Sequence, residues 1–153
     1  MAGRLERLIY TSQWAPSVAE HEDEIVRGIL GVSIHNNRLA DLTGLLVVHD
    51  GWFVQALEGG QPQIARVMDK IFQDRRHTGV RILGAGFADA RAFRDWDMIA
   101  AKPGPEADPL LTELGLLARF NGYSLDGASA LRLLMAVGDA ERQRERAALR
   151  ISA

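Results

Sequence analysis

The stretch Asp41–Gly59, DLTGLLVVHDGWFVQALEG, decides the fold of this chain. Two apolar runs, residues 42–48 and 52–57, flank the triplet His49-Asp50-Gly51. Because glycine readily adopts the positive φ that a tight hairpin turn needs, this pattern indicates two antiparallel strands joined by the triplet.

The second of these strands carries one polar side chain among apolar ones. Strand alternation places Gln55 on the same face as Phe53 and Leu57. Leaving a buried amide without a hydrogen-bond partner costs roughly 1–3 kcal/mol. The sequence therefore predicts that another group in the fold hydrogen-bonds Gln55.

The segments before the hairpin add a strand and a helix. Residues 4–12 alternate as a strand does, with Tyr10 on one of its faces. Ser17–Glu20 matches a capping box, which predicts that a helix begins there. The helical spacing of the apolar residues that follow brings Asn36 and Asn37 to the inner face at the C-terminal end of this helix.

The segments after the hairpin complete a recognisable order of elements. Pro62 suits the start of a second helix. The apolar residues of this helix recur at amphipathic spacing, and they are Ile64, Val67, Met68, Ile71 and Phe72. Residues 80–88 read as a fourth strand and residues 96–100 as a short fifth, in which Trp96 and Met98 would share a face. The order β-α-β-β-α-β-β predicts a ferredoxin-like α+β fold, with a five-stranded antiparallel sheet and two flanking helices.

The C-terminal part predicts two more helices. Asp108-Pro109 would begin a helix that continues to about Phe120, where Asn121-Gly122 would end it. A last helix is expected to start near Ser124 or Asp126. Its end, DAERQRERAALRISA, is mostly charged and is expected to project or fray.

Composition supports a division into two parts. We expect a first domain over residues 1–102 and an extension over residues 103–153, which holds a linker, the two helices and the charged tail. The apolar positions of these helices suit either packing on the open face of the sheet or contact with a second copy in a homo-oligomer. The sequence leaves both arrangements open.

Bulk properties exclude several classes of protein. With 153 residues, 47% of them hydrophobic and 25% charged, the composition is typical of a soluble globular protein. A formal net charge of −2 does not favour nucleic acid as a partner. No apolar run approaches the roughly 18–20 residues that a membrane span needs, and the N-terminus lacks the apolar core of a signal peptide. We therefore expect a cytoplasmic protein that contacts neither nucleic acid nor membrane directly.

Cysteine and histidine usage narrows the chemistry further. The chain has no cysteine, which excludes disulfides, thiolate metal sites, cysteine nucleophiles and sensors that form a cysteinyl adduct with a cofactor. The four histidines do not have the spacing of metal ligands, so no metal site is predicted; they are His21, His35, His49 and His77.

Three polar residues from different elements lie on predicted inner faces, namely Tyr10, Asn37 and Gln55. Each has an ordinary explanation by itself: a tyrosine can be buried for packing, an asparagine can end a helix, and loop carbonyls can satisfy a glutamine. Together they describe a polar seam between two helices and a sheet. Such a seam would suit a flat, hydrogen-bonding heterocycle.

A set of short motifs carries a resemblance to a known family. They are Tyr10-x-Ser12, Asn36-Asn37, Thr43-Gly44-Leu45-Leu46, Gln55-x-Leu57-Glu58-Gly59, Asp74-x-Arg76-His77 and Trp96-x-Met98. In this order and spacing, over about residues 4–100, the set resembles the signature of BLUF domains, the blue-light sensors that use FAD. The C-terminal part resembles the two-helix cap of short BLUF proteins, which lack a fused output domain.

The resemblance implies a binding site for the isoalloxazine ring of a flavin between the two helices and the sheet. Gln55 would bridge Tyr10 and the N5/C4=O edge of the flavin, and Asn37 would hold its C4=O/N3 side. Lys70 and Arg76 would be candidates for the C2=O side or the ribityl-phosphate chain. The resemblance also places near the ring Ile29, Ile71, Asn36 and His77. FAD is the implied cofactor, with FMN and riboflavin left open.

The resemblance further implies a blue-light photoreceptor and not an enzyme. The hypothesis is that light drives an electron and a proton from Tyr10 through Gln55 and leaves the Gln55 amide in an alternative hydrogen-bond arrangement. This rearrangement would give a red-shifted signalling state. Trp96 or Met98, whichever faces the site, would relay it through the fifth strand to the C-terminal helices. The signal would then pass to an unidentified downstream protein or through a change in self-assembly.

Two other readings remain open at this point. A ferredoxin-like binding module without flavin would give a colourless purified protein. A flavin redox enzyme would need a site for a substrate or nicotinamide, and the sequence contains no G-x-G-x-x-G loop of the dinucleotide-binding kind.

Overall fold

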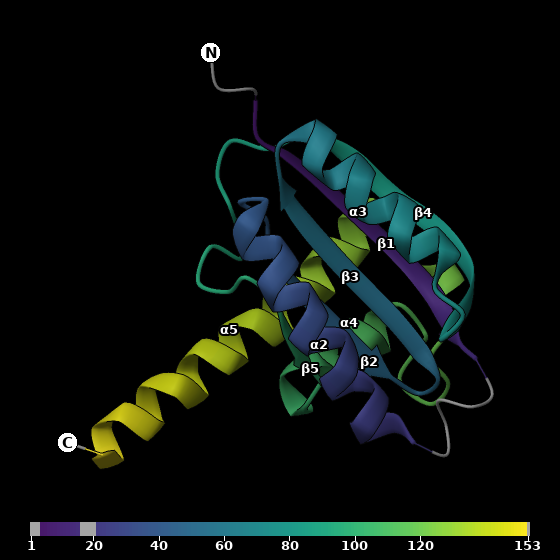
Figure 1. Cartoon of the computed structure of the whole chain (residues 1–153). Coiled ribbons are helices and arrows are strands. Elements are labelled where there is room, and N and C mark those ends of the chain that lie inside the picture. The colour runs from purple at the N-terminus through teal and green to yellow at the C-terminus, as the bar shows by residue number, and fades with distance from the viewer. Residues whose placement is uncertain (1–3, 16–20, 153) are drawn as a thin grey trace.

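The computed structural model of the chain describes residues 4–15 and 21–152, with the backbone alone for residues 30–32, 151 and 152. Figure 1 shows a central sheet with helices on both sides. Its strand order is β4-β1-β3-β2-β5. The strands are β1 (Glu6–Trp14), β2 (Thr43–His49), β3 (Trp52–Gly59), β4 (His77–Phe87) and β5 (Ile99–Ala101). The α-helices are α2 (Glu22–Leu39), α3 (Gln61–Gln73), α4 (Asp108–Glu113) and α5 (Gly127–Ser152). The expected α+β class with five strands, two flanking helices and two C-terminal helices is confirmed.

The expected hairpin forms the middle of the sheet. Strands β2 and β3 pair from His49 opposite Trp52 onward, and the two turn residues between them, Asp50 and Gly51, have φ angles of 51° and 84°. Two successive positive φ angles characterise a type I′ turn, whose twist matches that of the flanking strands. Strand β3 also pairs with β1, which makes it the centre of the sheet.

Two expectations about the fifth strand are wrong. Strand β5 comprises Ile99–Ala101 and runs parallel to β2, so the sheet is mixed rather than antiparallel. Trp96 and Met98 precede this strand and belong to different clusters of buried side chains, on opposite faces of the sheet. Alternation predicts a shared face only within a regular strand, and the segment before β5 is irregular.

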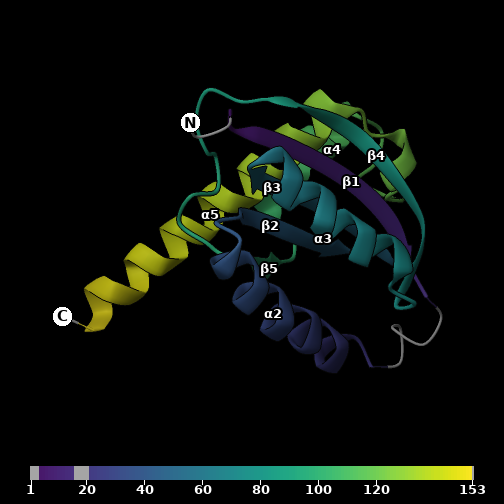
Figure 2. The same ribbon diagram turned by 45° about the horizontal axis from the view of Figure 1, so that its top comes forward.

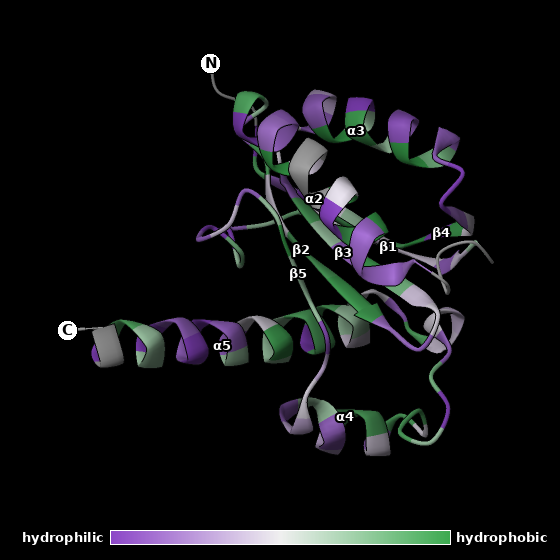
Figure 3. Cartoon of the chain, turned by 60° about the horizontal axis from the view of Figure 1, so that its bottom comes forward, coloured by the Kyte–Doolittle hydropathy of each residue, from purple (hydrophilic) through white to green (hydrophobic). Residues whose placement is uncertain are grey.

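The two faces of the sheet are covered by different helices (Figures 2 and 3). Helices α2 and α3 pack on the face that carries Tyr10, Phe53 and Leu57. Helices α4 and α5 pack on the opposite face, against Ile9 and Val54 among others. The C-terminal helices therefore pack on the open face of the sheet, which was one of the two arrangements that the sequence left open.

The C-terminal helices differ from expectation in one boundary. Helix α4 ends at Glu113 rather than near Phe120, because Gly115 adopts a φ of 71° and Leu116 N–H donates back to the carbonyl of Leu111 at 2.7 Å. Two short 3₁₀ helices flank this region, η1 (Pro105–Ala107) and η2 (Gly122–Ser124).

Helix α5 begins where the sequence placed it. The carboxylate of Asp126 accepts a hydrogen bond from the backbone N–H of Ser129 at 2.8 Å, which satisfies a donor that the first helical turn leaves free. The charged end of α5 remains helical to Ser152, and Figure 1 shows it extending away from the sheet, as expected for this tail.

Other expected boundaries are shifted by a few residues. Strand β1 lies two residues later than expected, and β4 begins at His77. Phe72 follows the apolar spacing of α3 but is 55% exposed; it lies at the border of the apolar stripe, one residue before the helix ends. The capping box at Ser17–Glu20 lies outside the described residues. Within residues 4–15 and 21–152, every helix is too short or too polar to traverse a lipid bilayer.

Candidate functional site

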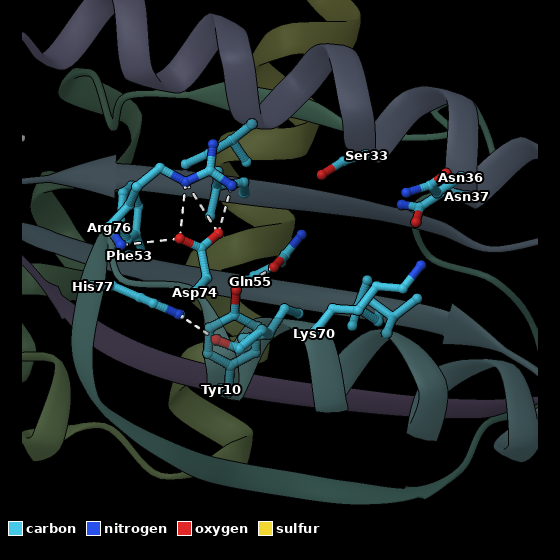
Figure 4. A pocket seen from close by; sticks show the side chains of 15 residues that line it. Tyr10, Ser33, Asn36, Asn37, Phe53, Gln55, Lys70, Asp74, Arg76 and His77 are labelled. Atoms are coloured by element: carbon cyan, nitrogen blue, oxygen red, sulfur yellow. Dashed lines mark hydrogen bonds and ion pairs between the residues drawn. The ribbon is translucent and has the colours of Figure 1, made fainter.

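A cavity lies between α2, α3 and the sheet face that they cover. Its volume is about 780 Å³ when the open space at its mouth is included. Figure 4 shows its side chains converging from both helices and from the strands. Its lining consists of Tyr10, Ile29, Ser33, Asn36, Asn37, Leu46, Phe53, Gln55, Leu57, Val67, Lys70, Ile71, Asp74, Arg76 and His77.

The floor of the cavity carries a buried tyrosine–glutamine pair. Tyr10 on β1 and Gln55 on β3 are direct neighbours in the strand register, and both are buried. The hydroxyl of Tyr10 donates a hydrogen bond to Oε1 of Gln55. The prediction that another group in the fold hydrogen-bonds Gln55 is therefore confirmed.

The other end of the Gln55 amide has a much weaker partner. Its Nε2 donates to Sδ of Met98 at 3.3 Å, and a thioether is a poor acceptor. The amide nitrogen carries a second hydrogen, and the amide lies at the cavity wall. Gln55 can therefore donate to an acceptor on the edge of a ring placed in the cavity.

Burial strengthens the preference of Tyr10 for its neutral, protonated form. Removal of the side chain from water, together with the negative charge of Asp74, raises the pKa of Tyr10 far above its usual value. The phenol is therefore neutral at ordinary pH and remains the hydrogen-bond donor to Gln55.

Amide groups and a cation occupy one end of the cavity. Asn36 and Asn37 project from the last turns of α2, and Lys70 reaches the same end from α3 (Figure 4). Asn37 is buried, and its Nδ2 donates to the carbonyl of Asp97 at 2.8 Å. Lys70 is exposed, so its charge remains hydrated.

An ion pair occupies the other end. The guanidinium of Arg76 donates to the Asp74 carboxylate, with Nε at 2.9 Å from Oδ1 and Nη2 at 2.5 Å from Oδ2. Burial alone would raise the pKa of Asp74, but the hydrogen bonds from the side chain and backbone of Arg76 outweigh it and lower that pKa. The same pairing raises the pKa of Arg76. Asp74 was not among the expected site residues, although the pattern Asp-x-Arg could have indicated such a pair.

His77 is held by two hydrogen bonds at the edge of the cavity. Its Nε2 lies 2.7 Å from the carbonyl oxygen of Ile71, and its Nδ1 lies 2.7 Å from Oγ of Ser12. A carbonyl can only accept, so Nε2 carries a hydrogen, and in the neutral ring Nδ1 accepts from the serine hydroxyl. His77 thereby connects the end of α3 to β1.

The structure thus brings together most of the expected site residues but separates the two relay candidates. Tyr10, Gln55 and every expected cofactor-binding residue line one cavity. Met98 touches the site through Gln55. Trp96 lies on the opposite face of the sheet, where its Nε1 donates to Glu145 of α5 at 3.0 Å.

Comparison with known proteins gives a consistent result. The family model for sensors of blue-light using FAD (BLUF) matches residues 5–99. The blue light- and temperature-regulated antirepressor BluF of Escherichia coli (strain K12) is 33% identical over 75 residues, which are 47% of this chain and 19% of that protein. This chain therefore spans about 19% of the length of that relative.

Two solved structures are similar over most of the chain. BlsA in its photo-activated state is 26% identical, with 88% of this chain and 94% of that chain covered and a TM-score of 0.79. The dark-state structure of BlrB, a BLUF protein, is 26% identical, with coverages of 92% and 99% and a TM-score of 0.67. The cavity, the Tyr10–Gln55 pair and these comparisons lead to one conclusion: the chain belongs to the BLUF family of blue-light sensors that use flavin.

Proposed function

We propose that this protein is a blue-light photoreceptor whose cavity between α2, α3 and the sheet binds a flavin without a covalent bond. The observation that carries this proposal is the buried Tyr10–Gln55 pair, because the free end of the Gln55 amide has only a thioether as its partner. FAD, the flavin named in the family description, is the cofactor that we assign, and FMN and riboflavin share its ring. When bound, the flavin supplies the absorption of blue light and accepts one electron and one proton.

The lining residues divide into groups that suit such a ligand. Ile29 and Ile71 are apolar side chains from α2 and α3 that would contact the two sides of the ring. Asn36, Asn37 and Gln55 offer amide donors and acceptors for its polar edges.

Three further residues would hold the remainder of the cofactor. The charges of Lys70 and Arg76 favour the carbonyl and phosphate groups of the ligand. His77 lies at the same edge of the cavity as Arg76. Because Lys70 has no planar fork, it can pair with such a group only as a point charge.

Tyr10 and Gln55 form the switch. Tyr10 releases an electron, and its phenolic proton leaves by way of the Gln55 carbonyl to which it is hydrogen-bonded. Rotation or tautomerisation of the amide exchanges its donor and acceptor ends, so the hydrogen bonds to Tyr10, to Met98 and into the cavity change together. A rearrangement of buried hydrogen bonds worth a few kcal/mol is enough to bias a two-state element.

Met98 is the first residue of the relay. Its sulfur contacts the Gln55 amide, and it directly precedes β5. Residues 1–102 would act as the sensing unit and residues 103–153 as the part that reports its state. The recipient is a downstream protein or a second copy of this chain, and the chain itself catalyses no reaction on a substrate.

The first test is an absorption spectrum of the purified protein in the dark and after blue light. The proposal predicts a flavin band that moves slightly to the red on illumination and returns in the dark. A flavin that bleaches instead would indicate redox chemistry. A colourless protein that also fails to take up added FAD, FMN or riboflavin would favour the flavin-free binding module.

A further inference from the structure

Four consecutive residues, Asp95–Met98, connect the cavity to α5. On the cavity side, Sδ of Met98 accepts from Nε2 of Gln55 at 3.3 Å. The neighbouring Asp97 is held by α2, since its carbonyl accepts from Nδ2 of Asn37 at 2.8 Å and its carboxylate accepts from Nε of Arg38 at 3.0 Å. This half of the segment therefore contacts two residues that line the cavity, Gln55 and Asn37.

The other half of the segment is held by α5. Nε1 of Trp96 donates to Glu145 at 3.0 Å, and the Asp95 carboxylate accepts from Nε of Arg142 at 2.6 Å. Arg142 also donates to the carbonyl of Ala92 at 2.5 Å, and its guanidinium lies 4.8 Å from the centre of the Trp96 ring. Polar and cation–π contacts thus attach α5 to the residues that directly precede Met98.

The chain before this segment is fixed to the sheet. Glu58 of β3 is fully buried, and its carboxylate accepts from the backbone N–H groups of Ala92 at 2.7 Å and Phe93 at 2.9 Å. The carboxylate also accepts from Nε of Arg7 on β1 at 2.9 Å and from the hydroxyl of Thr43 on β2 at 3.2 Å. Residues 92 and 93 are therefore anchored to β3, and a displacement of Met98 would be taken up by the residues after Phe93. These include Asp95 and Trp96, which Arg142 and Glu145 of α5 contact.

The far end of α5 has a different environment. Residues 143–150 are all exposed, and Figure 1 shows this end projecting beyond the sheet. Arg142 and Glu145 lie where the helix leaves the body of the protein. Their contacts with Asp95 and Trp96 therefore help to set the direction in which the exposed end points.

We propose that Asp95–Met98 is a coupling segment, and that Arg142 and Glu145 are positioning residues that pass a displacement of Met98 to the exposed end of α5. This inference rests on the proposed photoreceptor function. It assigns the transmission to a few polar contacts at the rim of α5 rather than to the apolar contacts beneath this helix. It also implies that the switch and its output can be separated by mutation.

The absence of cysteine from residues 1–153 allows a direct test in the flavin-loaded protein. Cysteines introduced as Arg66→Cys on the exposed side of α3 and Arg146→Cys on the end of α5 would carry nitroxide labels. The distance distribution between the labels is measured in the dark and after blue light. We expect a light-induced change in the labelled parent protein, and the loss of most of this change in Arg142→Ala, although the red shift of the flavin is retained.

Two further variants guard against a general loss of structure. Trp96→Phe keeps an aromatic ring beneath Arg142 but removes the Nε1 donor to Glu145, so it should reduce the change in distance without removing it. Arg142→Lys keeps the charge but loses the planar fork, so it should restore only part of the change that Arg142→Ala removes.

Arg144→Ala is the matched control, because Arg144 lies on the same helix and pairs with Glu141 rather than with the coupling segment. It should leave the change in distance intact. A full change in Arg142→Ala, or an equal loss in Arg144→Ala, would overturn the inference. So would a parent protein whose flavin shifts to the red while the labels do not move. A parent protein with no red shift at all would instead remove the proposed function, and this inference with it.

Discussion

The two faces of the sheet are built from the same strands but are closed in different ways. On the face covered by α4 and α5, the helix side chains Leu133, Leu134 and Val137 are fully buried against Val54 and other strand residues. On the face covered by α2 and α3, the strands carry Tyr10 and Gln55 among apolar residues, and a cavity remains beneath the helices.

This difference shows how one small sheet can combine stability with a buried polar site. Close packing of apolar side chains on the α5 face stabilises the fold. The α2–α3 face leaves space and retains amides whose hydrogen bonds can be rearranged. Departures from an ideal core are expected at functional sites, and here the cavity lies on one face only of the sheet that the structure describes. Mutations on the two faces should therefore have different consequences.

Gln55→Leu should have the largest effect on function. Leucine fills a similar volume but cannot exchange hydrogen bonds, so the light-induced red shift should be lost completely. The fold should survive, although the buried Tyr10 hydroxyl loses its acceptor, which should lower the free energy of unfolding by about 1–3 kcal/mol. Dark and illuminated absorption spectra give the measurement, with thermal melting as the check on folding.

Gln73→Leu is the control for this variant, since Gln73 is exposed at the end of α3. It should keep the full shift. A full shift in Gln55→Leu would contradict the assignment of the switch to this amide.

Leu133→Ala tests the α5 face and should have the largest effect on stability. Removing a fully buried leucine typically lowers the free energy of unfolding by about 2–5 kcal/mol. Denaturant titration measures this loss. The red shift of the protein that remains folded should be unchanged, because Leu133 packs on the face opposite the cavity. Leu149→Ala, at a position that is 71% exposed on the same helix, should change the unfolding free energy far less.

Asp74→Asn tests the ion pair at the edge of the cavity through its pH dependence. The pKa of Asp74 is lowered in the folded protein, so the pair stabilises the fold above the ordinary carboxyl pKa of about 3.9 and loses this effect as the pH falls through the lower, folded value. After allowance for solvent screening, the loss on mutation at pH 7 should be below about 1 kcal/mol. The stabilities of parent and variant should begin to converge below about pH 4 and become equal only below the lowered pKa of Asp74 in the folded protein.

The exposed Asp69 provides the comparison for this experiment. Asp69→Asn should show little difference from the parent protein at either pH. If the gap between parent and Asp74→Asn persisted unchanged at low pH, the Asp74–Arg76 ion pair would not be its source.

Phe72→Ser should have the smallest effect. Although Phe72 follows the apolar spacing of α3, its side chain is 55% exposed, so the unfolding free energy should change by less than about 0.5 kcal/mol. Phe93→Ala, at a fully buried phenylalanine, should cost about 3–5 kcal/mol by the same denaturant titration. A large loss for Phe72→Ser would mean that the border of the α3 face carries more of the core than its exposure indicates.

Local patterns predicted much of the fold because the interactions behind them are local. The positive φ of Gly51 made the hairpin predictable, and Asp126 correctly marked the start of α5. The sequence pattern overestimates the length of the helix that ends at Glu113. The left-handed φ of Gly115, which ends this helix, is visible only in the structure. Helical spacing indicates the direction of a side chain but not how far the neighbouring sheet extends, so the spacing alone does not show that Phe72 is exposed.

The candidate site divides in the same way. The sequence by itself determined that Gln55 needs a partner and that Tyr10 and Asn37 belong to the same polar seam, because burial of a polar group has a known cost wherever it occurs. Only the tertiary structure decided that Met98 contacts Gln55 while Trp96 contacts Glu145, on the other side of the sheet. Both residues lie in an irregular segment, where no periodicity relates neighbouring side chains. Their directions are therefore set by the elements that contact the segment, β3 through Gln55 and α5 through Glu145. These elements are distant from one another in the sequence and become neighbours only on folding.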